Sequence, residues 1–350
     1  QKQSPYLLLI ALLVLVAVLI PGLGRTVNGS TRWIPIGPLS LQPSEFAKVA
    51  VVVFMAGYLV RQQEEVRNNF SGFLKSLVVL GAFIVLFLLE PDFGAVVVMM
   101  GAVLGMFFLG GMRKRHISIV LLATVGFGTT TILAAEYRYK RLISYLDPWA
   151  DPFGAGYQLT QAQIAFGRGG WFGEGLGQSM QKLFYLPEAH TDFVYSVLAE
   201  EWGAFGAMVV VALYGVFILR GLNVGQKAER SGRLFSAYLA YGLVLLIAAQ
   251  AIINIGVNLG LLPTKGLTLP FVSYGGSSML ACAASLGILL RISLENSVTY
   301  GTLKAENDVH LDLRHKTLDT LNTDVTPGLD DVDQWFVDDD KKQDWRHDKV

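Results

Sequence analysis

The chain has 350 residues, of which 52% are hydrophobic and 16% charged, and its formal net charge is zero. With a mean hydropathy of +0.45, this composition is too apolar for an ordinary soluble domain and indicates an integral membrane protein. The single cysteine, Cys282, lies in an apolar stretch, which excludes a disulfide framework and a cysteine-based metal site. We expect no nucleic-acid partner.

Eight apolar stretches are long enough to cross a hydrocarbon layer of about 30 Å as helices. They cover residues 5–24, 45–61, 73–89, 93–112, 117–135, 193–219, 234–260 and 276–299. Runs such as 77–89 do not alternate between apolar and polar residues, as the strands of a membrane barrel would. The sequence therefore predicts an all-α polytopic membrane protein with about eight transmembrane helices.

Basic residues are concentrated in alternate connections between these stretches. Lys or Arg occurs at positions 61, 67, 113–115, 220, 227, 230, 233 and 291. Because short cytoplasmic loops keep an excess of Lys and Arg, we assign these connections to the cytoplasm. The remaining connections, 22–44, 90–94, 136–192 and 261–275, then face outward and hold most of the unusual polar residues.

The first outward connection contains Arg32 and Trp33 and leads to a helix start at Pro43. Glu45 and Lys48 follow on neighbouring positions of one helical face. They form an ion pair that closes the helix end, or Lys48 has a task at the outer membrane boundary, where an idle cation would be costly. Arg32 beside Trp33 is either an interfacial anchor or a binding residue.

The next outward turn, EPDFG at 90–94, has two carboxylates around a proline. Asp92 suits the start of the following helix, where the helix dipole favours an acid, and a direct catalytic role is an equal alternative. Further on, Gly101 and Gly105 form a GxxxG pattern. This pattern favours close helix packing.

The outward loop 136–192 is too long for a simple connector, and its many aromatic residues indicate that it is ordered. Apolar spacing over 159–166 predicts a short half-buried helix, interrupted by Gln161 and Gln163. A glycine-rich strap follows at 167–177. It lacks the strand and lysine pattern of a phosphate-binding loop, so we do not expect nucleotide binding.

The loop ends in LPEAHTD, which places Glu188, His190 and Asp192 within five residues. We expect Thr191 to cap the next helix and Asp192 to lie in its first turn. The helix dipole would stabilise the charged carboxylate there and oppose its use as a general base. Partial desolvation would remove that objection.

The later spans carry further polar residues. Glu200 and Glu201 lie at membrane depth, where structural pairing with cations is the favoured interpretation. Lys265, between two prolines of the last outward connection, suits an anionic lipid head group. The seventh stretch has an amide stripe that we expect to face the bundle through interhelical hydrogen bonds: Gln250, Asn254 and Asn258.

The end of the chain has a different character. From Thr302 onward there are 13 Asp or Glu against 7 Lys or Arg, with almost no apolar periodicity. Such a segment is disordered, a solvated interaction segment or an appended tail. We therefore predict a transmembrane domain at 1–300, whose outer loop 136–192 carries the candidate catalytic motif, and an acidic tail at 301–350 without a catalytic role.

Five motifs occur in a fixed order: RWIPIGPLSLQPSEFAK, EPDFG, DPFGAGYQLTQAQIAFGRGG, LPEAHTDF and GLLPTKGLTLPFVSYGGSS. Together they resemble the SEDS family, the membrane glycosyltransferases that polymerise peptidoglycan from lipid II, over about residues 5–300. The last two motifs are more similar to the cell-division member than to the elongation member. The family typically has ten spans, so the resemblance implies that this chain lacks the first two.

By this resemblance, the family's essential outer-loop aspartate falls on Asp192, which would accept the proton of the acceptor hydroxyl in an inverting reaction. Substrate-binding candidates, among them cations for the pyrophosphate leaving group, are Arg32, Trp33, Lys48, Gln161, Lys265, Glu188 and His190. Supporting residues are Glu45, Asp92, Glu200, Glu201, Asn254 and Asn258. We assign no cofactor, and a divalent cation bound by Asp192 and Glu188 stays open.

The resemblance also implies partners: lipid II, membrane lipids, a class B penicillin-binding transpeptidase of the FtsI type, and the FtsQ, FtsL and FtsB regulators. It places the protein in the bacterial cytoplasmic (inner) membrane, enriched at the division septum. Two other functions fit many spans and intramembrane acids: a lipid II flippase and a non-catalytic division scaffold. Polar residues gathered on one face disfavour the flippase, because alternating access needs a site near the midplane.

Overall fold

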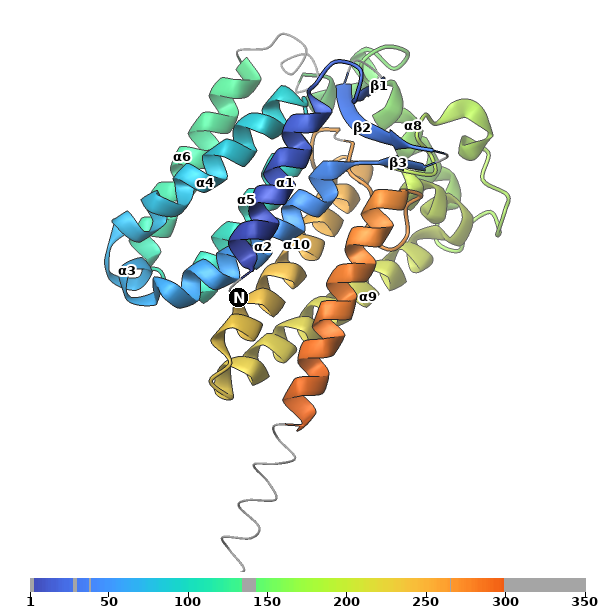
Figure 1. The fold of residues 1–350 in the computed structure, drawn as a ribbon. Helices are drawn as coiled ribbons and strands as arrows, with labels where there is room; N and C mark the ends of the chain where they lie inside the picture. The colour runs from blue at the N-terminus through green and yellow to red at the C-terminus, as the bar shows by residue number, and fades with distance from the viewer. Residues whose placement is uncertain (1–2, 28–29, 38, 134–142, 265, 299–350) are drawn as a thin grey trace, which may run out of the picture. The chain divides into compact units, whose positions relative to one another are not determined.

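The computed structural model describes the chain except at residues 1–2, 28–29, 38, 134–142, 265 and 299–350. Residues Gln1–Asn296 form one compact unit and Ser297–Val350 a second. The described part of the first unit is a bundle of helices (Figure 1). These are α1 (Ser4–Val18), α2 (Pro43–Arg61), α3 (Gln63–Asn68), α4 (Phe70–Leu89), α5 (Phe93–Leu109), α6 (Lys114–Leu133), α8 (Tyr157–Gly169), α9 (Val194–Arg230), α10 (Leu234–Asn258) and the unlabelled helix Gly276–Val298.

Each of the eight predicted apolar stretches overlaps one of these helices, although α1 ends at Val18 and α9 continues to Arg230. Within the described residues, five helices are long and apolar enough to cross a membrane: α2, α4, α9, α10 and Gly276–Val298. Helices α1 and α5 are also apolar but shorter, at 15 and 17 residues. The mainly helical membrane fold is confirmed, and the number of spans stays a prediction.

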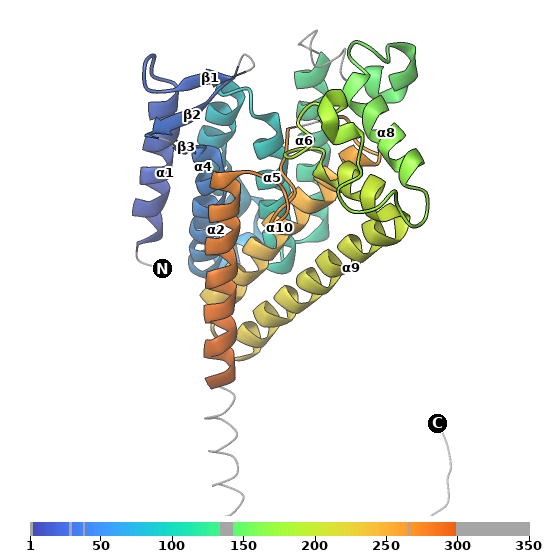
Figure 2. The ribbon, with the colours of Figure 1, turned by 90° about the vertical axis from the view of Figure 1, so that its right-hand side faces the viewer.

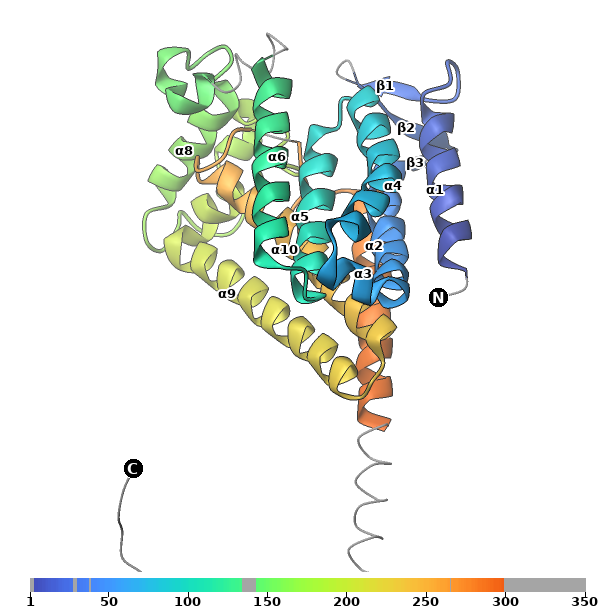
Figure 3. The same cartoon turned by 90° about the vertical axis from the view of Figure 1, so that its left-hand side faces the viewer.

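A small antiparallel sheet lies in the first predicted outward connection, which the all-helical prediction missed. Its strands, in the order β1-β2-β3, are β1 (Arg25–Val27), β2 (Ser30–Ile36) and β3 (Leu39–Leu41). Thr26 pairs with Thr31, and Pro35 with Ser40. The sequence STRWIPI is rich in β-branched and aromatic residues, which favour strands, and its proline excludes a helix interior. The sheet lies at the same end of the bundle as α8 (Figures 1 and 3).

Helix α10 forms the centre of the bundle, because it packs against α2, α5 and α9 (Figure 2). A Cβ added at Gly105 of α5 would lie 2.7 Å from Leu245 Cδ1 of α10, so the missing side chain lets the helices approach. A Cβ added at Gly101 would lie 3.9 Å from the Cβ of Ala249, which is an ordinary van der Waals contact. The predicted close packing at the GxxxG pattern is therefore confirmed, most clearly at Gly105.

Helix α9 is interrupted at Gly203, whose φ is 70°. The glycine-rich strap that follows α8 fills the interruption: Ala204 N donates to Gly170 O at 2.8 Å, and Glu174 N donates to Glu200 O at 3.0 Å. A Cβ at Gly203 would lie 2.5 Å from the backbone nitrogen of Gly173. Because lipid offers no hydrogen bonds, this exchange of backbone partners allows a helix break within a membrane-crossing helix.

Candidate active site

The candidate catalytic residue Asp192 lies in a turn before α9 and is half-buried. Its backbone carbonyl accepts hydrogen bonds from the side-chain amides of Asn254 and Asn258, at 2.8 and 2.9 Å. The Asn258 Oδ1 also accepts from the Ser196 hydroxyl at 2.7 Å, which ties the start of α9 to α10. The predicted polar stripe thus faces the bundle, as expected, and holds the backbone of Asp192.

The prediction that Thr191 caps the following helix is wrong. Helix α9 begins at Val194, its N-cap Phe193 makes no side-chain cap, and its first turn contains no acid. The Thr191 hydroxyl donates instead to the Glu188 carboxylate at 2.6 Å, because the chain turns there with Glu188 at a φ of 57°. Asp192 therefore lies just before the N-cap of α9 and not, as predicted, in its first turn.

The last predicted outward connection packs against this turn. Ser273 Oγ donates to Thr191 O at 2.5 Å, and Tyr274 N donates to His190 O at 2.9 Å. A Cβ at Gly266 would lie 3.2 Å from the Asp192 Oδ2 atom. The preceding residue, Lys265, lies outside the described residues. The sequence reasoning named Lys265 in this connection and missed the contacts of Ser273 and Tyr274, although both residues belong to the motif GLLPTKGLTLPFVSYGGSS.

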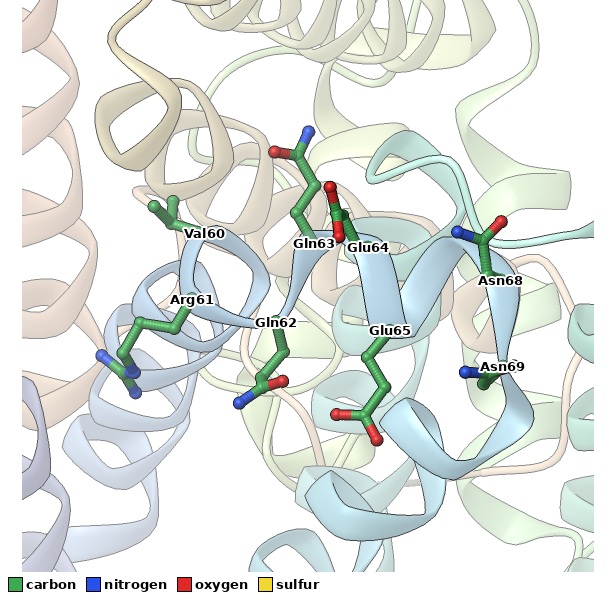
Figure 4. A pocket seen from close by; sticks show the side chains of 8 residues that line it. All are labelled: Val60, Arg61, Gln62, Gln63, Glu64, Glu65, Asn68 and Asn69. Atoms are coloured by element: carbon green, nitrogen blue, oxygen red, sulfur yellow. The ribbon is translucent and has the colours of Figure 1, made fainter.

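A hollow of about 570 Å³ opens beside the turn, and its walls are mostly apolar. Its lining includes residues on both sides of Asp192: His190, Val194, Val272, Ser273, Tyr274 and Met279. Another hollow, of about 550 Å³, lies where α2 leads through α3 to α4, at the end of the bundle away from the sheet (Figures 1 and 4). None of the residues that line it was predicted as a site residue. They are Val60, Arg61, Gln62, Gln63, Glu64, Glu65, Asn68 and Asn69.

Glu45 and Lys48 form the predicted ion pair, with Lys48 Nζ 2.8 Å from Glu45 Oε1. Lys48 is only 1% exposed, and its ammonium also donates to Gln250 Oε1 at 3.1 Å. The Gln250 amide in turn donates to the Thr268 hydroxyl at 3.1 Å. This buried network joins α2, α10 and the connection 261–275. It also neutralises a cation that would be costly in the membrane.

Asp92 caps α5 as predicted, since its side chain accepts from Ala95 N at 3.1 Å. Its other oxygen accepts from the Ser44 hydroxyl at 3.1 Å, next to Glu45 in α2. The turn between α4 and α5 also receives Arg32, whose Nε donates to Glu90 O at 2.9 Å and whose terminal nitrogen donates to Pro91 O. Strand β2 therefore holds Arg32 over this turn, with Trp33 half-buried beside it.

The remaining predicted substrate-binding residues lie in the Asp192 turn or in α8, which packs against it. Gln161 is half-buried in α8, next to Ala162, which packs with Leu186, Ala189 and Phe193 of the turn. Glu188 and His190 are exposed. Within the described part of the chain, no group of three or more His, Cys, Asp or Glu side chains could hold a metal ion. The hypothesis of a divalent cation therefore gains no ligand set from these residues.

Glu200 and Glu201 are paired as expected. Fully buried Glu200 accepts a hydrogen bond from Ser179 Oγ at 2.5 Å and forms an ion pair with Arg168, whose Nε lies 3.2 Å from Glu200 Oε1. Glu201 pairs with Lys182 at 2.6 Å. The sequence reasoning named the acids but not these partners, because the partners lie 19 to 32 residues upstream, in α8 and in the segment just after the strap.

The fold and the site define a polytopic helical membrane protein whose unusual polar side chains converge at one end of the bundle. The chain belongs to the FtsW, RodA and SpoVE family of cell cycle proteins, whose model it matches over residues 1–298. A relative from Hahella chejuensis, named "Probable peptidoglycan glycosyltransferase FtsW", is 56% identical over 295 residues, covering 84% of this chain and 74% of the relative. A relative of the same name from Legionella pneumophila is 52% identical, covering 85% and 75%.

Two solved structures are similar to this fold. A chain of a peptidoglycan synthase complex, described for its coordination of polymerization and crosslinking, has a TM-score of 0.70 at 30% identity, covering 84% of this chain and 82% of that one. The crystal structure of the rod shape determining protein RodA of Thermus thermophilus has a TM-score of 0.59 at 29% identity, covering 84% and 79%. These similarities extend over the whole helical domain.

Proposed function

We propose that this protein polymerises lipid II into glycan strands at the outer face of the cytoplasmic membrane, with Asp192 as the general base. The enzyme class is peptidoglycan glycosyltransferase, the class in the names of relatives more than 50% identical to the chain. The observation that carries the proposal for the site is the clamp on Asp192: two α10 amides hold its backbone carbonyl, while its side chain stays half-buried.

The reaction follows from the chemistry of a donor linked through pyrophosphate. The acceptor sugar hydroxyl attacks the anomeric carbon of the donor, and its proton passes to the Asp192 carboxylate. The bond from that carbon to the pyrophosphate oxygen breaks, and the lipid pyrophosphate leaves with the bonding electron pair. Attack from the opposite side inverts an α-linked donor into a β-linked glycan.

Developing negative charge on the leaving pyrophosphate requires cations. Arg32 suits this role, because its guanidinium is half-buried and rests on two backbone carbonyls. Lys48 is enclosed and paired with Glu45, so we propose that it supports the site from below. Lys265 is implied by the family resemblance alone. The proposal does not depend on its position.

We further propose that the protein works at the division septum with a transpeptidase partner of the FtsI type and with FtsQ, FtsL and FtsB. The similarity to a chain of a peptidoglycan synthase complex supports the transpeptidase. The names of the relatives support the septal role.

The test uses the full chain in lipid nanodiscs with its transpeptidase partner and lipid II. We expect glycan strands from the wild type, and a loss of at least ~100-fold for Asp192→Asn, which is the lower end of the range for a general base. If the variant still binds lipid II, the loss lies in the chemical step and not in substrate binding. Polymerisation by Asp192→Asn at the wild-type rate would exclude Asp192 as the base. Movement of lipid II across vesicle membranes without polymer would favour the flippase.

A further inference from the structure

The carboxyl group of Glu90 has an environment unlike that of the other acids described above. It lies in the turn just beyond the end of α4, is 0% exposed, and neither of its oxygens has a hydrogen-bond partner among the described residues. An ionised carboxylate without partners is very costly to bury, so such a group neutralises instead. Burial, reinforced by the charge of Asp92, raises the pKa of Glu90 to about 8, although the Arg32 cation opposes this rise.

Arg32 binds the same turn through hydrogen bonds to uncharged acceptors. Its guanidinium donates to the backbone carbonyls of Glu90 and Pro91, and over the described ranges it makes no ion pair with a carboxylate. Carbonyl oxygens fix the orientation of a guanidinium without cancelling its charge. The positive charge of Arg32 is therefore preserved, provided that the Glu90 side chain beside it carries no negative charge.

We propose that Glu90 is a positioning residue: its backbone carbonyl holds Arg32 in the working position, and its side chain leaves Arg32 there only while the carboxyl carries no charge. The inference rests on the proposed role of Arg32 at the substrate pyrophosphate. When Glu90 loses its proton, its carboxylate becomes the nearest ion-pair partner for the guanidinium. Arg32 then turns toward Glu90, and both the charge and the geometry offered to the pyrophosphate are lost.

The charged groups that act on Glu90 are few. Asp92 at the start of α5 raises its proton affinity, and Arg32 from β2 lowers it. Lys48 and Glu45 of α2 neutralise each other at 2.8 Å. Asp92 is itself held by Ser44 and by Ala95 N. Glu90 is thus the acid in this turn that is free of hydrogen bonds among the described residues, and its protonation acts directly on Arg32.

The first experiment is a pH profile of lipid II polymerisation from pH 6 to 10, using the full chain with its transpeptidase partner in nanodiscs. We expect wild-type activity to fall on the alkaline side with an apparent pKa of about 8, which is a loss of roughly tenfold at pH 9 for a single ionisation. Glu90→Gln cannot ionise and should keep polymerising at pH 9. Glu90→Leu should behave in the same way, because the neutral acid makes no hydrogen bond that leucine would lose. An unchanged alkaline loss in both variants would overturn the proposal.

The second experiment does not use activity, so that its failure can be distinguished from failure of the proposed function. Infrared spectroscopy follows the carbonyl stretch of protonated carboxyl groups during a pH titration. We expect a band that titrates near pH 8 in the wild type and is missing from Glu90→Gln. In Arg32→Gln the band should titrate at higher pH, because the cation that favours ionisation is gone. An Arg32→Gln titration identical to that of the wild type would disprove the coupling, even in a protein that polymerises nothing.

Discussion

Two buried carboxylates, Glu200 and Glu90, show how differently this fold treats acids of equal burial. Both are 0% exposed. Glu200 accepts from Ser179 Oγ, Met180 N and Gln181 N and pairs with Arg168, whereas Glu90 has no hydrogen bond from the described residues. The fully partnered acid fixes α8 and residues 179–181 to α9. An unpartnered acid is free to gain or lose a proton. The difference separates a structural region from one that can respond to its surroundings.

The largest expected effect comes from removing the carboxylate of Glu200, the acid with hydrogen-bond partners. Glu200→Leu would leave a hydroxyl and two backbone N–H groups buried without an acceptor. We expect a loss of about 3–5 kcal/mol in the free energy of unfolding, measured by thermal unfolding in nanodiscs, because each buried donor left without an acceptor costs about 1–3 kcal/mol. Glu201→Gln is the control, because Glu201 is partly exposed and should cost less than ~1 kcal/mol. Equal effects of the two changes would contradict the structural role of Glu200.

The interrupted helix gives a second test of the same region. Gly203→Ala would force a side chain into a positive φ and place its Cβ 2.5 Å from the Gly173 nitrogen. We expect a destabilisation of about 1–3 kcal/mol from strain at this position. Gly215 lies in the same helix with open space around its Cα, so Gly215→Ala should be neutral or stabilising by up to ~1 kcal/mol. Comparable unfolding temperatures for the two variants would show that the strap tolerates a side chain.

The contrast between these regions also explains which features the sequence could predict. Helices and the amide stripe of α10 follow from apolar runs and from spacing by four, which are local patterns. The partners of Glu200 and the placement of Arg32 over the Glu90 turn depend on contacts between distant segments, with 58 residues separating Arg32 from Glu90. Thr191 was misassigned because a threonine before a helix is a good cap by type, while the turn at Glu188 decides where its hydroxyl lies.

The hydrogen bonds that hold the Asp192 carbonyl can be tested for a role in activity that goes beyond a contribution to stability. Asn258→Ala would remove one amide from the Asp192 carbonyl and the acceptor of the Ser196 hydroxyl. We expect a loss of stability of about 1–3 kcal/mol and a fall in polymerisation of about 10–100-fold, because small displacements of a reacting group are costly. Asn296 is an equally buried asparagine far along the sequence, bonded to Val224 O and Arg233. Asn296→Ala should lose similar stability without the fall in activity, and equal activity losses would refute the clamp.

The last prediction concerns the pH dependence of stability that Glu90 confers. Its folded pKa of about 8 lies above the ordinary value of 4.5, so between these values the folded protein keeps a proton that the unfolded chain releases. Stability therefore decreases as the pH rises through this window, by at most about 1.4 kcal/mol per pH unit, and changes no further above it. Glu90→Gln should remove this slope. The pKa of Glu65 is lowered, chiefly by its bond to Lys75, so both states have it ionised in the window and Glu65→Gln should leave the slope intact. A wild-type unfolding temperature that stays constant from pH 5 to pH 8 would mean that Glu90 is ionised in the folded protein, and the contrast drawn here between Glu90 and Glu200 would fail.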